Sequence, residues 1–257
     1  MNKIIHCGEV YNCDCIEFMR SLPDKHFDVA VCDPPYGAGN SEVLMDAGKR
    51  RFNKTGRFAK YHHKTNNIPN SQNIRSGYML SERYKLEGRS NPKWDTAPQK
   101  EFFDELFRVS KNQIIWGGNY FTLPPTRCFL VWRKTNIVDG FSMAQAEYAW
   151  TSFQGNSMVY EQSSIRMPNS GKFHPTEKPQ ELYGWIYKNF VEEGQTIFDP
   201  MMGSQTSRAA AFKMGIDYVG CEIDKYYFDK GCEWFDRECH GITKTKNGNT
   251  IIELSLF

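Results

Sequence analysis

The chain has 257 residues, 40% of them hydrophobic, so it is long enough to bury a substantial core in one large domain or in one domain with an insertion. This length excludes a small peptide held together by disulfides. The formal net charge of +2 by itself gives no reason to expect a nucleic-acid partner.

The N-terminus and the cysteines indicate a cytoplasmic protein. MNKIIHCGEVYNCDC lacks the apolar stretch of a signal peptide, and no run approaches the roughly 18 apolar residues of a membrane span. The eight cysteines are scattered without a C-x-x-C pair, which is typical of reduced thiols. Cys13, Cys15 and His6 lack a usual ligand spacing, so we interpret these cysteines as small buried residues and predict no metal site.

The apolar patterns predict strands and helices in an order typical of an α/β protein. In chain order we expect a strand in FDVAVC, a helix in PQKEFFDELFRV and a strand at Gln113–Trp116. Strands in CFLVWRK and AEYAWTSF and a helix starting at Pro179 follow. The last elements are a strand at Thr196–Phe198, a helix at Ser204–Met214 closed by Gly215, and a strand in DYVGC. This order predicts a single doubly wound, mostly parallel sheet with ligand sites at the carboxyl ends of its strands.

The first strand breaks off into Asp33-Pro34-Pro35-Tyr36. Proline cannot continue a hydrogen-bond ladder, and two in succession fix an extended backbone whose carbonyls face outward. Asp33 adds a carboxylate acceptor and Tyr36 a flat ring, so the segment suits a planar group with an exocyclic NH₂. One N–H of that group could bond to Asp33 and the other to the Pro34 carbonyl. Taken alone, the four-residue string also fits a simple proline-rich turn.

Residues 37–93 interrupt the alternation of strands and helices. They are polar and rich in Asn, Ser and Gly, and the part from Lys49 to Lys93 contains twelve Lys or Arg residues against two Glu. This pattern predicts an insertion or a long loop with a strong local excess of positive charge on an otherwise acidic chain.

DPPY at residues 33–36 resembles the hallmark D/N/S-P-P-Y/F of the DNA amino-methyltransferases, which use S-adenosylmethionine to methylate N6 of adenine or N4 of cytosine. FDPMMGSQTS, beginning at Phe198, is similar to this family's cofactor string, and HPTEKP at 174–179 matches another of its strings. The catalytic string comes before the other two strings along the chain. This order resembles that of the permuted β class, which has phage and bacterial members. Essentially the whole chain outside residues 37–93 takes part in the resemblance.

The resemblance implies one methyltransferase domain over residues 1–257, with a Rossmann-like fold and a circularly permuted motif order. It implies that Asp33 and Asp199 end adjacent parallel strands. Residues 37–93 would be a basic DNA-binding insertion, or alternatively a solvated loop, and residues 135–173 a short target-recognition region. Glu147 and Trp150 are assigned to the scaffold. The predicted DNA contacts are Lys49, Arg50, Arg51, Lys54, Arg57, Lys60, Arg133, Lys134 and Arg166.

The family's cofactor contacts carry over to this chain position by position. Asp199 would receive the ammonium of the cofactor, Glu222 its ribose hydroxyls, and Asp14 its adenine amino group. The helix N-terminus after Gly203 would bind the methionine carboxylate. The predicted cofactor-binding residues are Asp14, His174, Thr176, Lys178, Asp199, Gly203, Ser204, Gln205, Thr206 and Glu222.

Gln205 departs from the glycine that the family usually has at this position. A residue with a Cβ there is expected to have a negative φ, in the first turn of the helix. Its side chain could narrow the cofactor site.

The function that the resemblance implies is site-specific methylation of double-stranded DNA, as in restriction-modification, with Asp33, Pro34, Pro35 and Tyr36 as catalytic residues. A flipped base would stack on Tyr36 while Asp33 and the Pro34 carbonyl orient its amine for direct methyl transfer. Asp at the first position of the motif favours N6 of adenine. The alternatives are N4 of cytosine, RNA or a protein amide as substrate, or a non-catalytic DNA-binding or clamp-associated module. Monomer and homodimer both stay open.

The C-terminal ELSLF resembles the Q-L-S/D-L-F peptide by which bacterial DNA enzymes dock on the ring-shaped sliding clamp, although Glu253 stands where glutamine is usual. Leu254, Leu256 and Phe257 also alternate as in a strand. We favour a terminal strand of the sheet over a docking peptide.

Overall fold

The computed structural model describes residues 8–37, 96–137, 144–164, 173–174, 177–244 and 250–252. The chain divides into two compact units. One comprises Met1–Pro34, Gln99–Ile137 and Gln145–Phe257, and the other comprises Pro35–Pro98 and Val138–Ala144. All helices and strands given below belong to the first unit. The predicted catalytic string crosses the boundary, because Asp33 and Pro34 belong to the first unit and Pro35 and Tyr36 to the second.

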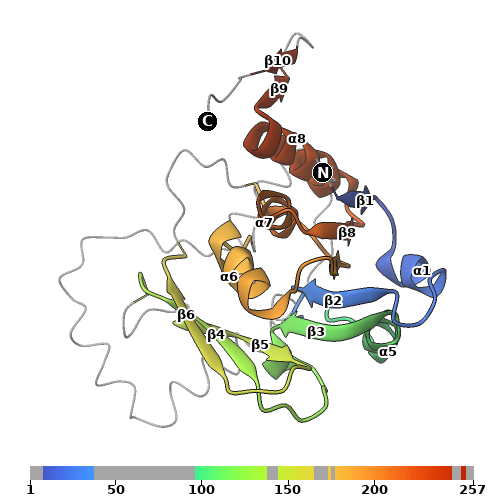
Figure 1. Ribbon diagram of the computed structural model, residues 1–257, viewed down its shortest axis with the longest axis vertical. Coiled ribbons are helices and arrows are strands. Elements are labelled where there is room, and N and C mark those ends of the chain that lie inside the picture. Colours follow the sequence, from blue (N-terminus) through green and yellow to red (C-terminus); the bar gives the residue numbers. More distant parts are fainter. Residues whose placement is uncertain are drawn as a thin grey trace, which may run out of the picture. The chain divides into compact units, whose positions relative to one another are not determined.

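A mixed eight-stranded sheet forms the centre of the first unit (Figure 1). Its spatial order is β1-β8-β7-β2-β3-β5-β4-β6, and the strands from β1 to β3 in this order run parallel. β5 is antiparallel to both of its neighbours, and β4 is parallel to β6. The strands are β1 (Glu9–Tyr11), β2 (Phe27–Cys32), β3 (Ser110–Trp116), β4 (Phe129–Lys134), β5 (Ala146–Thr151), β6 (Met158–Gln162), β7 (Thr196–Asp199) and β8 (Asp217–Cys221).

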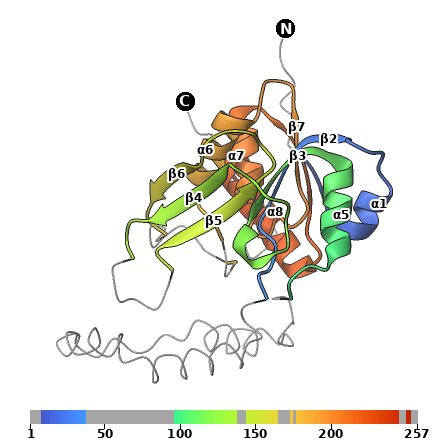
Figure 2. The ribbon, with the colours of Figure 1, turned by 90° about the horizontal axis from the view of Figure 1, so that it is seen from below.

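Helices cover both faces of this sheet (Figure 2). α1 (Cys15–Arg20) and α5 (Lys100–Val109) lie on one face. α6 (Gln180–Phe190), α7 (Thr206–Met214) and α8 (Lys225–His240) lie on the other. A short 3₁₀ turn, η1 (Gly118–Tyr120), follows β3. The prediction of a doubly wound, mostly parallel sheet is therefore confirmed.

β2 shows why its sequence is a continuous apolar run. Val29 and Val31 belong to the core beneath α6 and α7, whereas Ala30 and Cys32 belong to the core beneath α1 and α5. Successive side chains of a strand point to opposite faces, and both faces of this strand are covered by helices. Each of these four side chains is at most 1% exposed, so an apolar residue is required at every position.

The register between β2 and β7 places two predicted site residues at one edge of the sheet. The strands are parallel neighbours, with Val29 opposite Ile197 and Ala30 opposite Phe198. Asp33 directly follows β2, and Asp199 is the last residue of β7. The prediction that the two aspartates end adjacent parallel strands is confirmed, although β7 comes much later in the chain.

The helix boundaries follow their predicted signals with one exception. Pro179 is the N-cap of α6, and Gly215 ends α7 with φ of +66°, as expected of a glycine after a helix. α7 begins at Thr206, two residues later than the sequence predicts. The delay is explained by Gln205, which has a left-handed backbone conformation with φ of +62°.

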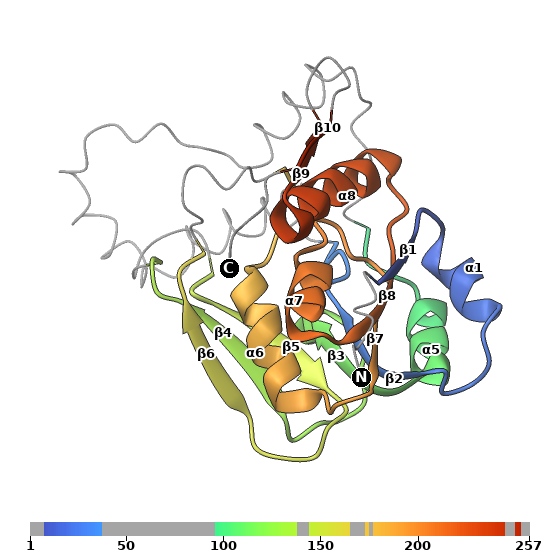
Figure 3. The same ribbon diagram turned by 45° about the horizontal axis from the view of Figure 1, so that its top comes forward.

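The C-terminal strand lies outside the main sheet. β9 (Ile242–Lys244) and β10 (Thr250–Ile252) pair with each other in a separate antiparallel sheet beyond α8 (Figure 3). β10 ends before Leu254, Leu256 and Phe257, on which the prediction of a terminal strand of the main sheet depends, so that prediction is not tested. Residues 253–257 lie outside the described residues, so the clamp-docking interpretation stays a prediction. Within the described ranges, none of the helices has the length and apolar character needed to cross a membrane.

Candidate active site

Three buried or half-buried carboxylates meet where β2, β7 and β8 end. Asp33 follows β2, Asp199 ends β7 and Glu222 follows β8. Because β2, β7 and β8 are parallel and adjacent, their carboxyl ends lie at one edge of the sheet (Figure 3). The charges of Asp33 and Glu222 both act on the carboxyl of Asp199. Asp33, Asp199 and Glu222, predicted from the sequence to have catalytic and cofactor roles, therefore lie at one edge of the sheet.

Asp199 is only 2% exposed. Its carboxylate accepts hydrogen bonds from the Met201 backbone N–H at 3.1 Å and from the Ser207 hydroxyl at 2.6 Å. Burial raises its pKa to about 7, even though these two donors favour the ionised form, and the negative charge of Asp33 adds to the increase.

Glu222 is 8% exposed and joins β8 to the turn after β7. Its carboxylate accepts from the Gly203 N–H at 3.0 Å and from the Asp224 N–H at 2.8 Å. Burial raises its pKa to about 7 against the effect of these donors. Neither Asp199 nor Glu222 has an ion-pair partner among the residues that the structure describes. Two buried carboxylates of this kind suit a ligand that brings a cationic group and hydroxyl donors.

Position 203 requires a glycine because the segment that contains His174 approaches it closely. Gly203 has φ of +50°, and a Cβ at this position would lie 3.1 Å from Nε2 of His174. The His174 ring contacts the Tyr227 ring edge-on, with ring centroids 4.5 Å apart. The HPTEKP and FDPMMGS segments are thus in contact, as their shared assignment to the cofactor site requires. Thr176 lies outside the described residues.

The backbone conformation of Gln205 differs from the one predicted. Its φ is +62° instead of negative, and its side chain is fully buried. The amide Nε2 donates to the Phe228 carbonyl at 3.1 Å, and Oε1 accepts from Nη1 of Arg208 at 2.9 Å. The side chain lies against Gly231 of α8, where a Cβ would be 2.6–2.8 Å from its atoms. Gln205 therefore retains the backbone conformation that glycine favours and directs its side chain toward α8.

Ser204, Thr206 and Asp14 are held by local hydrogen bonds. The hydroxyls of the buried Ser204 and Thr206 are 3.3 Å apart, and Thr206 donates to the Lys178 carbonyl at 3.0 Å. Asp14 is the N-cap of α1, because Oδ1 accepts from the backbone N–H of Ile16 at 2.7 Å.

The ammonium of Lys178 pairs with the carboxylate of Asp33, a contact that the sequence did not predict. It forms ion pairs with Asp33 and with Glu147, and the side chain is only 4% exposed. From the sequence, Lys178 is predicted to bind the cofactor and Glu147 to belong to the scaffold. No local signal in AQAEYAW indicates that its glutamate reaches this lysine, so sequence reasoning missed the contact.

Lys134 is a further correction, because its side chain is 8% exposed and its ammonium is 2.5 Å from Glu147 Oε1. A buried and paired ammonium is not available to a phosphate, so we withdraw Lys134 as a DNA contact. Arg133 is 66% exposed and forms a surface ion pair with Glu161. The other predicted DNA contacts, Lys49, Arg50, Arg51, Lys54, Arg57, Lys60 and Arg166, lie outside the described residues.

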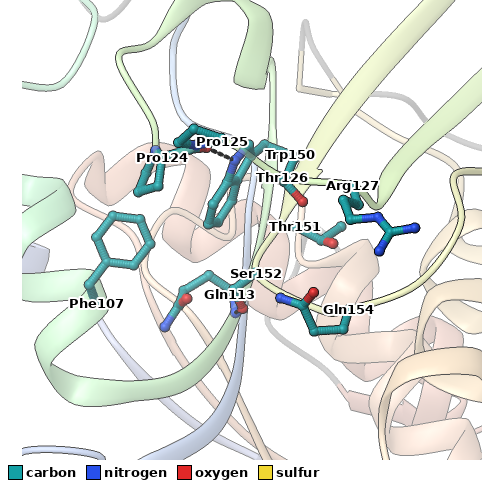
Figure 4. Close-up of a pocket in the computed structure, with 10 residues that line it drawn as sticks. All are labelled: Phe107, Gln113, Pro124, Pro125, Thr126, Arg127, Trp150, Thr151, Ser152 and Gln154. Carbon is teal, nitrogen blue, oxygen red and sulfur yellow. Dashed lines mark hydrogen bonds between the residues drawn. The ribbon is translucent and has the colours of Figure 1, made fainter.

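A separate cavity of about 400 Å³ lies beside β5, between Phe107, Trp150 and Gln154 (Figure 4). None of the predicted site residues lines it. The Trp150 indole N–H donates to the Pro124 carbonyl at 2.7 Å, and the Thr151 hydroxyl donates to the Cys128 carbonyl. These two lining groups are thus engaged within the protein.

Comparisons with known proteins agree with this geometry. Residues 52–233, more than half of the chain, match a family described as DNA methylase, of the N6 and N4 type. The type II methyltransferase M2.MboI of Moraxella bovis is 22% identical over 91% of this chain and 88% of its own length. The type II methyltransferase M2.DpnII of Streptococcus pneumoniae is 26% identical over 88% of this chain and 87% of its own.

Among solved structures, the cytosine-N4-specific PvuII DNA methyltransferase has a TM-score of 0.50 and 12% identity, with 94% of this chain and 93% of its own covered. At this level of identity the likeness concerns the fold alone.

Proposed function

This chain belongs to the DNA methylase family, and we propose that it transfers the methyl group of S-adenosylmethionine to the N6 amine of an adenine in double-stranded DNA. The observation that carries the proposal is the placement of Asp33 and Asp199 at the ends of adjacent parallel strands. An amine held by Asp33 and a cofactor held at Asp199 would then face each other across the distance between two neighbouring strands.

The cofactor-binding residues fit the chemistry of S-adenosylmethionine. Asp199 is a buried carboxylate with a raised pKa, which the cofactor's ammonium would stabilise in its ionised form. Glu222 would accept from ribose hydroxyls, and the αL backbone at Gly203 and Gln205 presents the N-terminus of α7 to the methionine carboxylate. When bound, the cofactor supplies an electrophilic methyl group on its sulfonium.

The catalytic residues act by orientation. Asp33 and the Pro34 carbonyl accept the two N–H groups of the amine, and Tyr36 stacks on the flipped base. An amine held in this way would direct its nitrogen lone pair toward the methyl group that the bound cofactor would supply. Most of the rate acceleration comes from positioning and electrostatic orientation, without a strong general base.

DNA is the substrate that membership of the family implies, and the basic segment within residues 37–93, together with Arg133 and Arg166, is our proposal for its binding. We also propose a cytoplasmic location and a place in restriction-modification. Deletion of residues 253–257 tests docking on a sliding clamp: loss of clamp binding with intact folding would support it.

Asp33→Ala tests the proposed function. We expect it to abolish transfer of labelled methyl groups to duplex DNA while equilibrium binding of S-adenosylmethionine persists, because Asp199 and Glu222, the carboxylates proposed to hold the cofactor, lie at β7 and β8. Competition with RNA and with protein substrates identifies the polymer, and mass spectrometry of digested DNA separates N6-methyladenine from N4-methylcytosine. Near-wild-type transfer by Asp33→Ala would refute the assignment.

A further inference from the structure

Four charged side chains alternate in sign beside the proposed catalytic carboxylate. Lys134 of β4 contacts Glu147 Oε1 at 2.5 Å, and Lys178 contacts Glu147 Oε2 at 3.2 Å and also Asp33 Oδ2. The four residues come from β4, β5, the segment before α6 and the end of β2. Segments that are far apart in the sequence thus meet in one chain of ion pairs.

The side chains in this chain of ion pairs are largely withdrawn from water. Their exposed fractions are 8% for Lys134, 23% for Glu147, 4% for Lys178 and 14% for Asp33. Two ammonium groups and two carboxylates compensate each other, which is the condition under which buried charges are tolerated. Apolar residues of the same volume would often pack as well, so four charges beside the proposed catalytic carboxylate suggest a task other than stability.

Glu147 lies between the two lysines in this chain of ion pairs. Burial by itself opposes ionisation of its carboxyl, but the charges of Lys178 and Lys134 outweigh burial and lower its pKa to about 2. Glu147 is therefore ionised at any working pH. The register supports this position, because Glu147 lies opposite Trp132 on the antiparallel β4, two residues before Lys134.

Lys178 is held between two carboxylates and beside an aromatic ring. Its ammonium lies 5.1 Å from the centre of the Trp116 ring, which adds a cation–π attraction. With the charge of Glu147 removed, Asp33 would attract this ammonium more strongly. The carboxylate of Asp33 would then be drawn toward Lys178 and away from the amine that it must orient.

We propose that Glu147 is a positioning residue, which shares the Lys178 ammonium with Asp33 and thereby fixes the Asp33 carboxylate for the target amine. The inference rests on the proposed function, because it assigns Asp33 to the amine. Glu147 acts through Lys178 and touches no substrate.

The ionisable groups around Lys178 determine the pH test. Burial raises the pKa values of Cys32 and Tyr183 well above their ordinary values, so both stay neutral near pH 8. Among the residues that the structure describes, the carboxylates of Asp33 and Glu147 act on the ammonium, and Lys134 lies on the other side of Glu147. Burial opposes the charge on Lys178, yet these two carboxylates raise its pKa above the ordinary value. Loss of one carboxylate must lower it.

Glu147→Gln removes the charge at nearly constant volume and tests the proposal. We expect kcat to fall on the order of 100-fold, while the Kd for S-adenosylmethionine and the KM for DNA stay close to wild type. We also expect a decline of kcat at alkaline pH that the wild type lacks, because a buried lysine with one carboxylate loses its proton more readily. Glu147→Asp keeps the charge and should restore part of kcat without that alkaline decline.

Glu238→Gln is the matched control, since it removes a carboxylate from a surface ion pair between α8 and Lys213 near the C-terminal end of α7. It should leave kcat and its pH profile unchanged. Thermal unfolding of each variant shows whether it is folded, and Glu147→Asp replaces Glu147→Gln if the latter is not. If Glu147→Gln keeps the kcat and the pH profile of the wild type while Asp33→Ala is inactive, the inference about Glu147 is overturned and the proposed function stands. Activity in Asp33→Ala would overturn the proposed function.

Discussion

Gln205 shows how a full side chain can occupy a position that favours glycine. A left-handed backbone costs a residue with a Cβ about 1–2 kcal/mol. The buried amide of Gln205 offsets this strain, because it bonds to the Phe228 carbonyl and to Arg208. A pair of buried hydrogen bonds contributes a comparable amount.

Gln205→Gly tests this balance. Glycine relieves the strain, but it removes both hydrogen bonds and leaves a void against α8. We expect the free energy of unfolding to fall by about 2 kcal/mol in urea denaturation, since the lost contacts outweigh the relieved strain. Binding of S-adenosylmethionine should persist, because glycine adopts the same φ readily. A more stable variant would contradict the packing role of this side chain.

At the scale of elements, the packing of α7 against α8 depends on one missing methyl group. Gly231 lies within α8, where glycine is usually unfavourable, yet its lack of a Cβ makes the space that Gln205 fills. Gly184 lies within α6 and has no atom within 4 Å of its would-be Cβ. The two glycines are thus in similar helical settings with opposite surroundings.

Replacement of each glycine by alanine should therefore have opposite effects. Gly184→Ala should raise the free energy of unfolding by about 0.5–1 kcal/mol, the usual gain of alanine over glycine in a helix. Gly231→Ala should lower it, because the new Cβ would overlap Gln205. In the Gln205→Gly background the loss should disappear, and chemical denaturation of the four combinations measures this coupling. Additive effects would show that the two positions do not compete for space.

At the scale of the whole molecule, the parallel strand order gathers acidic groups at one edge of the sheet. The pKa values of Asp199 and Glu222 are about 7 in the folded protein, compared with ordinary values of 3.8 and 4.5. Between these values the folded protein binds more protons than the unfolded chain. The contribution of the two groups to stability is therefore complete below about pH 4 and is lost as the pH rises through about 7.

Cofactor binding should show the opposite pH dependence. The cofactor's ammonium favours ionised Asp199, so the affinity for S-adenosylmethionine should rise from pH 6 to pH 8, with release of protons at the lower pH. Isothermal titration in buffers of different ionisation enthalpy measures both quantities. Asp199→Asn should bind the cofactor weakly at either pH and should be more stable than the wild type at pH 8. An affinity independent of pH would contradict the assignment of Asp199 to the ammonium.

Much of the fold and of the site could be predicted from local patterns. The apolar run of β2, the periodicity of α5 and the caps at Pro179 and Gly215 act over a few residues, and the structure agrees with each of them. The resemblance of DPPY and FDPMMGS to known strings then indicated which strand ends carry the site. Boundaries and partners were less predictable, as the late start of α7 and the separate β9–β10 sheet show.

The sequence by itself determined the order of the strands and helices from β2 to β8 apart from η1 and β6, the carboxylates at the strand ends and the family, because these depend on short-range rules and on recognisable strings. Only the tertiary structure decided which charges meet. Lys134 resembles an exposed basic residue but is buried against Glu147, and Lys178 pairs with Asp33. The conformation of Gln205 likewise depends on space left by Gly231. Such partners are set by the register of distant segments, which no local pattern encodes.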